Sequence, residues 1–131
     1  MSYDLYIRKK RSNRTLQLKS LHNIHGGTYA IGGTTEAHLN VTYNYGALLR
    51  ESLKTKDGIY SLDKKDVKET IPILESAIKY LEETYPITEL PTEDYWAATP
   101  LNVKKALVDT VTLAKLAVSD YPDANLVWRI G

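Results

Sequence analysis

Apolar and polar residues alternate near the N-terminus of this chain. Residues 3–9 and 14–20 place apolar side chains at every second position, and Ser12-Asn13 between them supplies turn chemistry. The pattern predicts an N-terminal β-hairpin. The β-favouring residues 28–31, bounded by two Gly-Gly pairs, predict a short third strand.

Helical spacing replaces the alternation after this region. Residues 36–40 are either extended or a loop that leads to the first helix. Apolar residues recur at helical intervals from Val41, with Asn40 or Thr42 as the N-cap and Asp57-Gly58 as the end.

Two longer helices are predicted further along the chain. Thr70 and Pro72 mark the start of one, which stops before Tyr85-Pro86. Thr99-Pro100 places a cap and a proline at the start of the next, and Tyr121-Pro122 ends it. The apolar faces of both helices predict that they pack against a common core.

Residues 126–130 are β-like and are predicted to add an edge strand to the N-terminal sheet. Strands and helices are therefore segregated along the chain, which indicates an α+β fold. We expect one domain over residues 1–131, with a small antiparallel sheet packed against about three helices. This length is sufficient for a single core without cross-links.

Composition narrows the classes of function. Seventeen basic and 16 acidic residues leave a net charge of +1, which argues against general nucleic-acid binding. The chain has no cysteine, so disulfides and thiolate sites are excluded. The charged N-terminal residues and the lack of a membrane-length apolar run predict a soluble cytoplasmic protein that does not bind membranes.

One basic cluster stands out, at residues 8–11 with Arg14. It lies at the predicted turn, where it forms either a solvated turn or a phosphate-binding patch.

The aromatic residues are ten tyrosines and two tryptophans, with no phenylalanine. Tyrosine combines apolar area with a polar tip and suits binding surfaces as well as half-buried packing.

Residues 22–45 are the candidate binding segment. They contain all three histidines and two Gly-Gly pairs, Gly26-Gly27 and Gly32-Gly33, among many hydroxyl and amide side chains. Successive glycine amides form anion-binding nests, or else a tight turn and a bulge. Thr28, Thr34 and Thr35 offer hydroxyls to a phosphate or ribose, and Glu36 offers a carboxylate to a ribose diol.

Metal and nucleophilic chemistry have weaker support. His22, His25 and His38 with Glu36 supply enough ligands for a zinc site, but their spacing is not that of two ligands on one helix face. Hydrogen-bonding loop histidines are the alternative interpretation. No nucleophile-elbow motif is present, and no catalytic residue, metal or cofactor is predicted.

Aromatic and amide residues extend the candidate site. Tyr43 and Asn44 begin the first predicted helix, where one face packs and the other is presented. Tyr95 and Trp96 precede the last helix, where they either pack as a hydrophobic staple or stack on a planar ligand.

With these residues, the chain resembles a group of small uncharacterised proteins encoded by bacteriophages and prophages. The resembling blocks are His22-Asn23, GGTY from Gly26, GGTTEA from Gly32, LNVTYNY from Leu39, IPILE from Ile71, Asp94-Tyr95-Trp96, and Thr99-Pro100 with Asn102. The resemblance covers most of residues 3–128 and carries no established activity. It implies a phage accessory protein acting in a bacterial host, in a host-takeover or anti-defence role, and favours binding over turnover.

These observations predict a non-enzymatic protein that sequesters a nucleotide-like or phosphorylated small molecule, within one chain or across a homo-oligomer interface. The alternatives are a protein that inhibits a host defence protein through its tyrosine-rich surface, and a metal-assisted hydrolase using the three histidines and Glu36. The predicted ligand-binding residues are His22, Asn23, Gly26, Gly27, Thr28, Tyr29, Gly33, Thr34, Thr35, Glu36, Asn40, Tyr43, Asn44, Tyr95 and Trp96.

Overall fold

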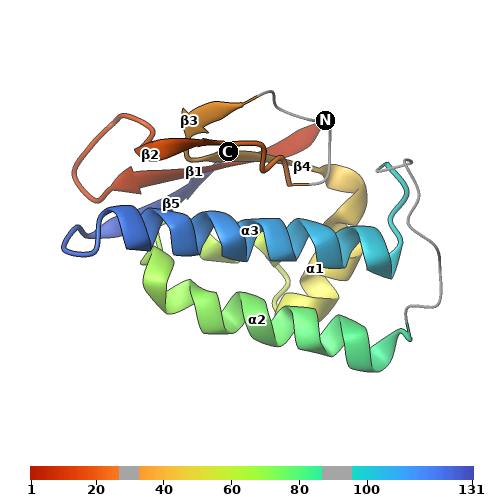
Figure 1. The fold of residues 1–131 in the computed structure, drawn as a ribbon. Coiled ribbons are helices and arrows are strands. Elements are labelled where there is room, and N and C mark those ends of the chain that lie inside the picture. The colour runs from red at the N-terminus through yellow and green to blue at the C-terminus, as the bar shows by residue number, and fades with distance from the viewer. Residues whose placement is uncertain (27–32, 87–95) are drawn as a thin grey trace.

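A computed structural model describes residues 1–26, 33–86 and 96–131 of the chain. Two small sheets lie over a layer of helices, as the α+β prediction required (Figure 1). The elements in chain order are β1 (Ser2–Lys9), β2 (Gln17–His22), β3 (Thr34–Glu36), β4 (His38–Thr42), the 3-10 turn η1 (Tyr43–Tyr45), α1 (Gly46–Leu53), the 3-10 turn η2 (Gly58–Leu62), α2 (Val67–Thr84), α3 (Pro100–Asp120) and β5 (Leu126–Ile130).

The larger sheet has the antiparallel order β4-β1-β5. Alternate residues of its strands face the helices, and the register pairs Tyr3 with Val41, Leu5 with Leu39 and Ile7 with Trp128. All six side chains are buried. The predicted C-terminal edge strand is thereby confirmed as β5.

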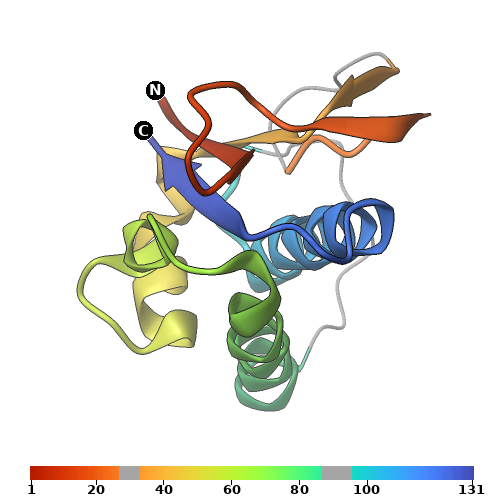
Figure 2. The same ribbon diagram turned by 90° about the vertical axis from the view of Figure 1, so that its left-hand side faces the viewer.

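The predicted N-terminal hairpin is wrong, although both of its strands form. β1 is the central strand of its sheet and bonds β4 on one side and β5 on the other, so it leaves no edge for β2. β2 pairs instead with β3 in a separate ribbon. Two residues beside this ribbon connect it to β1. The N–H of Leu16 donates to the Ile7 carbonyl over 2.8 Å, and the N–H of Ile7 donates to the Ala37 carbonyl over 3.0 Å. The ribbon diverges from the larger sheet (Figure 2).

The helix α3 begins and ends where the sequence predicts. Thr99 is the N-cap, and its Oγ1 accepts the N–H of Asn102 over 3.1 Å, while Pro100 takes the first helical position. The helix ends before Tyr121. Its buried face packs along α2, and both helices lie on the same side of the larger sheet (Figure 2).

The helix α2 begins at Val67, earlier than predicted, with Pro72 inside it. Asp66 caps the helix, because its carboxylate accepts the N–H of Glu69 over 3.1 Å. The first turn is held by the core: Val67 is buried, and the buried Thr70 hydroxyl accepts the Trp128 indole N–H over 2.8 Å. The start of α2 is therefore marked by a local cap that the sequence analysis missed, and it is held by these tertiary contacts.

The first helix also differs from its prediction. Val41 belongs to β4, since Leu39 and Val41 are buried against β1, and residues 36–40 are extended for most of their length. Thr42 does act as a cap, but of the 3-10 turn η1, where its Oγ1 accepts the N–H of Asn44 over 3.3 Å. The α-helix begins at Gly46 and ends at Leu53. The predicted strand over residues 28–31 lies outside the described residues.

Candidate functional site

The ring of His22 is held between two backbone groups. Its Nδ1 accepts the N–H of Ile24 over 3.1 Å, and its Nε2 lies 2.6 Å from the Glu36 carbonyl, to which it donates. This pattern assigns a neutral ring with the proton on Nε2. Both ring nitrogens are therefore used, and the role of His22 is to fix β2 against β3.

The amide of Gly26 holds a carboxylate of the protein itself. Gly26 adopts φ 76°, and its N–H donates to Asp109 Oδ2 of α3 over 3.2 Å. Burial raises the pKa of Asp109, an effect that the Gly26 bond and the nearby His25 and Lys105 oppose. A Cβ at Gly26 would lie 3.1 Å from the Asn40 carbonyl oxygen. This glycine thus joins the loop to β4 and α3.

The hydroxyls after Gly33 are also used locally. Thr34 Oγ1 accepts the N–H of Glu36 over 3.1 Å, and Thr35 Oγ1 donates to Gln17 Oε1 over 2.6 Å. The position of Gly33 is open, because a Cβ there would lie 3.7 Å from its nearest neighbour, Asn23 Oδ1. These residues tie the β2–β3 ribbon together. Gly27, Thr28, Tyr29 and Tyr95 lie outside the described residues.

A polar network covers the outer face of the larger sheet. Asp4 Oδ1 accepts the Nε2–H of His38 and the side-chain amide of Asn40, each over 2.9 Å. Asn40 also donates to Ser2 Oγ over 2.7 Å, and the His38 ring stacks on Tyr6 with centroids 4.5 Å apart. Asn40 thus serves the sheet. Sequence analysis missed Asp4 as the partner of Asn40. The two residues are opposite each other in the β1–β4 register, which the sequence did not predict.

The three histidines do not meet. His22 faces the Glu36 carbonyl, His38 faces Asp4, and Asp109 is the carboxylate near His25. Residues 1–26, 33–86 and 96–131 contain no group of three histidine, aspartate or glutamate side chains able to hold a metal ion. The arrangement needed for the metal-assisted hydrolase is not formed by the residues predicted for it.

Aromatic side chains meet where β1, η1 and η2 adjoin. The rings of Tyr3 and Tyr43 are 4.4 Å apart, and those of Tyr3 and Tyr60 are 5.1 Å apart in an edge-on arrangement. The Tyr43 and Tyr60 hydroxyls share a hydrogen bond of 3.4 Å. Tyr3 is almost buried beneath them, whereas Tyr43 is 38% exposed and Tyr60 is 42% exposed.

Asn44 connects this cluster to Trp96. Its side-chain amide donates to the Trp96 carbonyl over 2.9 Å, and the Trp96 residue is 47% exposed. About half of Trp96 is thus covered, and its packing as a staple or its stacking on a planar ligand both stay predictions. We define Tyr43, Tyr60 and Trp96, the exposed aromatic residues of this region, as the aromatic surface.

Tyr60 contributes a phenol with a raised pKa to the aromatic surface. The hydrogen bond with Tyr43, together with partial burial and the neighbouring phenols, raises the pKa of Tyr60 to about 12. Tyr60 is therefore protonated at neutral pH and remains a donor and an acceptor. Sequence analysis missed Tyr60, because only the fold brings η2 beside η1.

Other tyrosines are engaged within the protein. Tyr80 and Tyr85 both donate to Glu51 Oε2, over 3.0 and 2.6 Å, and these hydrogen bonds raise the pKa of each phenol. Tyr121 donates to the Gln17 carbonyl over 2.6 Å. The tyrosine bias of the composition is thus divided between internal ties and the aromatic surface.

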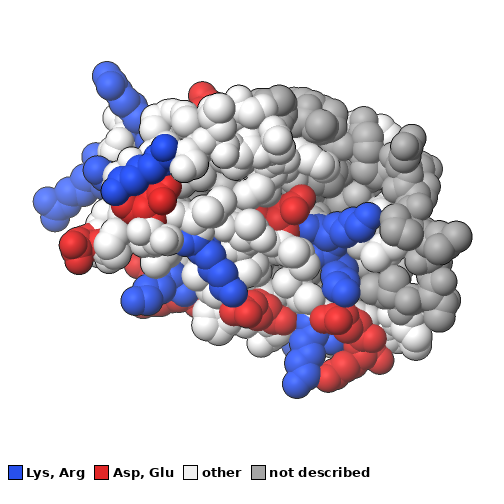
Figure 3. Space-filling view, viewed as in Figure 1, with Lys and Arg blue, Asp and Glu red and all other residues white. Residues whose placement is uncertain are grey.

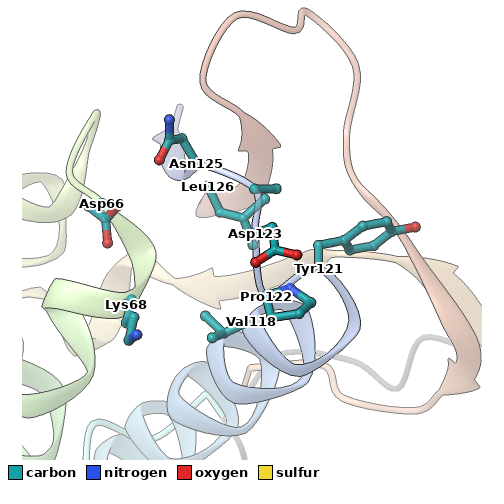
Figure 4. A pocket seen from close by; sticks show the side chains of 9 residues that line it. Asp66, Lys68, Val118, Tyr121, Pro122, Asp123, Asn125 and Leu126 are labelled. Atoms are coloured by element: carbon teal, nitrogen blue, oxygen red, sulfur yellow. The ribbon is translucent and has the colours of Figure 1, made fainter.

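Hollows formed by the described residues lie elsewhere. One of about 180 Å³ separates the start of α2 from the turn after α3, with Asp66 and Lys68 on one side and Pro122 and Asp123 on the other (Figure 4). The ring of Tyr121 points away from Asp66 and Lys68. This hollow contains none of the residues predicted to bind a ligand.

No helix within the described ranges has the length and apolar character needed to cross a membrane. Comparisons of the chain with models of protein families, with curated proteins and with solved structures give no match.

Proposed function

We propose that this protein is a non-enzymatic binding module that engages a protein partner through the aromatic surface. The observation that carries the proposal is the exposure of Tyr43, Tyr60 and Trp96 around one junction of the fold. Tyrosine and tryptophan dominate the energetics of protein interfaces, because each offers a large rigid area with a polar tip.

The geometry supports a surface that is organised before binding. Tyr3 packs beneath Tyr43 and Tyr60, and the shared hydroxyl bond restricts both exposed rings. Asn44 positions the backbone of Trp96 through its hydrogen bond. Side chains that are already ordered lose less conformational entropy when a partner binds, so more of the contact energy appears as affinity.

A protein partner fits this surface better than a small molecule does. Small-molecule sites are concave and enclose most of their ligand. The described part of residues 22–45 instead commits His22, Gly26, Thr34 and Asn40 to internal hydrogen bonds. Sequestration of a nucleotide-like ligand by this segment remains a prediction, because it also depends on residues 27–32.

The resemblance to phage proteins supports a partner from the bacterial host. A phage accessory protein that occupies the surface of a host defence protein needs only an exposed, ordered contact patch. Such a function requires no catalytic group, which agrees with the internal engagement of the polar groups described above. Within this proposal the protein acts in the host cytoplasm.

The proposal is tested by affinity capture from bacterial lysate with three forms of the tagged protein. The wild type is expected to retain one host protein in stoichiometric amount. The double variant Tyr43→Ala, Tyr60→Ala is expected to lose it, whereas Ile73→Ala is expected to keep it. Ile73 is a matched control because it is an apolar residue on α2 with similar exposure, 40%. Thermal unfolding verifies that all three forms are folded.

Equal retention by the double variant and the wild type would contradict the proposal. Native mass spectrometry of the gently purified protein separates the alternatives. A bound mass of nucleotide size would support the small-molecule prediction instead, and a dimer lost in the double variant would assign the aromatic surface to self-association.

A further inference from the structure

Basic residues are concentrated in one short stretch of the chain. Between Asp4 and Glu36 the sequence has no acidic residue, but it contains Arg8, Lys9, Lys10, Arg11, Arg14 and Lys19. The net charge of the whole chain is only +1, because acidic residues elsewhere in the sequence offset this local excess of positive charge. The stretch forms the end of β1, the loop to β2, and the start of β2.

These cations differ from three of the lysines on α2 and α3. Lys79, Lys104 and Lys115 lie 3.4 to 3.8 Å from glutamate oxygens. Lys9, Lys10, Arg11, Arg14 and Lys19 form no such ion pair with any residue in the described part of the chain. In Figure 3 basic and acidic side chains alternate along the helices, and at the end of the molecule where the β1–β2 loop lies basic side chains extend outward beside a few acidic ones.

The loop borders an open hollow of about 240 Å³, which is lined by two of these cations, Lys9 and Arg14, together with Ser12 and Tyr121. The loop is ordered by its own backbone. The N–H of Ser12 donates to the Lys9 carbonyl over 2.8 Å, and the N–H of Arg14 donates to Ser12 Oγ over 3.1 Å. These bonds hold Lys9 and Arg14 at the two ends of one turn.

Tyr121 forms an aromatic wall of the hollow. Its hydroxyl is anchored on the Gln17 carbonyl, and the ammonium groups of Lys9 and Lys19 lie 5.1 and 5.5 Å from its ring centroid. Cation–π contacts place both ammonium groups beside the hollow. Asp120, the residue before Tyr121, accepts the backbone N–H of Lys19 over 2.9 Å but does not line the hollow.

We propose that this hollow binds the polyphosphate group of a small phosphorylated molecule. Lysine and arginine side chains bind phosphate oxygens through charge-assisted hydrogen bonds, and the Ser12 hydroxyl adds a neutral donor. Lys9 and Arg14 line one hollow, and Lys19 lies against its Tyr121 wall. This arrangement favours a compact anion over the evenly spaced phosphates of a nucleic-acid strand.

The site is independent of the proposed function. The hollow lies at the C-terminal end of α3, and Trp96 precedes the N-terminal end of that helix (Figure 1). A helix of 21 residues is about 30 Å long. The two sites are thus at opposite ends of the molecule, and substitutions at one are expected to leave the other intact.

Calorimetric titration with inorganic tripolyphosphate at low salt tests the proposal. The double variant Lys9→Gln, Arg14→Gln is expected to bind at least about tenfold more weakly than the wild type, because each charge-assisted bond contributes more than a neutral one. The control Lys79→Gln, Lys115→Gln removes the same charge from exposed ion pairs and is expected to bind within about twofold of the wild type. The Tyr43→Ala, Tyr60→Ala variant is expected to bind normally.

Amide shifts in nuclear magnetic resonance spectra provide a second readout that needs no variant. Tripolyphosphate is expected to shift residues 9–19 and 120–125 and to leave α2 unchanged. The proposal is overturned if millimolar tripolyphosphate gives no heat and no shifts, or if the Lys79→Gln, Lys115→Gln control weakens binding as much as the Lys9→Gln, Arg14→Gln variant does. It is also overturned if single-stranded DNA binds this end more tightly than tripolyphosphate, since that result would assign a nucleic-acid surface.

Discussion

Residues 22–36 and the aromatic surface are both rich in side chains that bind ligands in other proteins, but they differ in what those side chains contact. In the first region the polar groups of His22, Gly26 and Thr34 bond to other parts of the chain. In the second, the rings of Tyr43 and Tyr60 rest on Tyr3 and remain more than a third exposed.

The comparison shows that residue type does not identify a binding group. A histidine, a glycine amide or a threonine hydroxyl contributes to binding when it is free to contact the ligand. Buried polar groups almost always have a hydrogen-bond partner. The polar groups of a segment that packs against a sheet therefore form hydrogen bonds within the protein. The rings of Tyr43 and Tyr60 need no hydrogen-bond partner, because only their hydroxyl groups are polar.

The largest expected effect tests the structural role of the first region. Gly26→Ala is expected to lower the free energy of unfolding by about 2 to 3 kcal/mol, because φ is positive and the new Cβ crowds β4. Gly33→Ala is expected to change it by less than about 0.5 kcal/mol, since its surroundings are open. Urea denaturation measures both. Similar losses in the two variants would show that Gly26 has no special role.

The next effect concerns partner affinity. Tyr60→Ala is expected to weaken binding of the captured host protein by about 2 kcal/mol, or roughly thirtyfold, if this ring is a central contact. Ile73→Ala is expected to change the affinity less than about threefold, because its side chain is equally exposed but lies on α2. Biosensor titration with purified partner gives both values. A thirtyfold loss in Ile73→Ala would move the interface to the helices.

The Asp109→Asn variant removes the negative charge of Asp109 but keeps a side-chain oxygen that can accept the Gly26 N–H. Burial raises the pKa of Asp109 above its value in the unfolded chain, so ionisation of this carboxyl destabilises the folded state. The loss of stability grows as the pH rises through the usual carboxyl range, and it persists above that range. The asparagine variant is therefore expected to gain stability relative to the wild type between pH 3 and pH 7. Urea denaturation at both pH values measures the difference. A relative loss of stability at pH 7 would show that the carboxylate charge is favourable.

The smallest effect sharpens the description of the aromatic surface. Tyr43→Phe removes the hydroxyl whose hydrogen bond is the largest cause of the raised pKa of Tyr60. The pKa of Tyr60 is then expected to fall from about 12 toward 10, with little change in stability. Ultraviolet absorbance titration of the wild type and the variant measures the shift. An unchanged titration would mean that the two hydroxyls are not bonded in solution.

Local signals in the sequence predicted the features that depend on neighbouring residues. Thr99 and Pro100 mark the start of α3, and Tyr121 marks its end, because capping and proline geometry act over a few residues. The alternation of residues 3–9 and 14–20 likewise located two strands correctly. The α+β class follows from the order of these elements.

Pairing and burial depend on distant residues and were predicted less well. β1 pairs with strands from residues 38–42 and 126–130, so alternation alone could not exclude the hairpin with β2. The start of α2 is marked by the local Asp66 cap, which the sequence analysis missed, and is held by buried Val67 and by the Thr70–Trp128 bond across 58 residues. Tyr43 and Asn44 were among the predicted site residues, but Tyr60 joins them only through the fold of η2.

Photo-crosslinking from position 60 tests the central claim most directly. A photoreactive phenylalanine analogue replaces Tyr60 in one form of the protein and Ile73 in a second, and each is irradiated in bacterial lysate. A single crosslinked host protein from position 60, with none from position 73, is the result that a partner-binding aromatic surface predicts. Crosslinking to that host protein from position 73 but not from position 60, or no crosslinked protein from either, would contradict the claim.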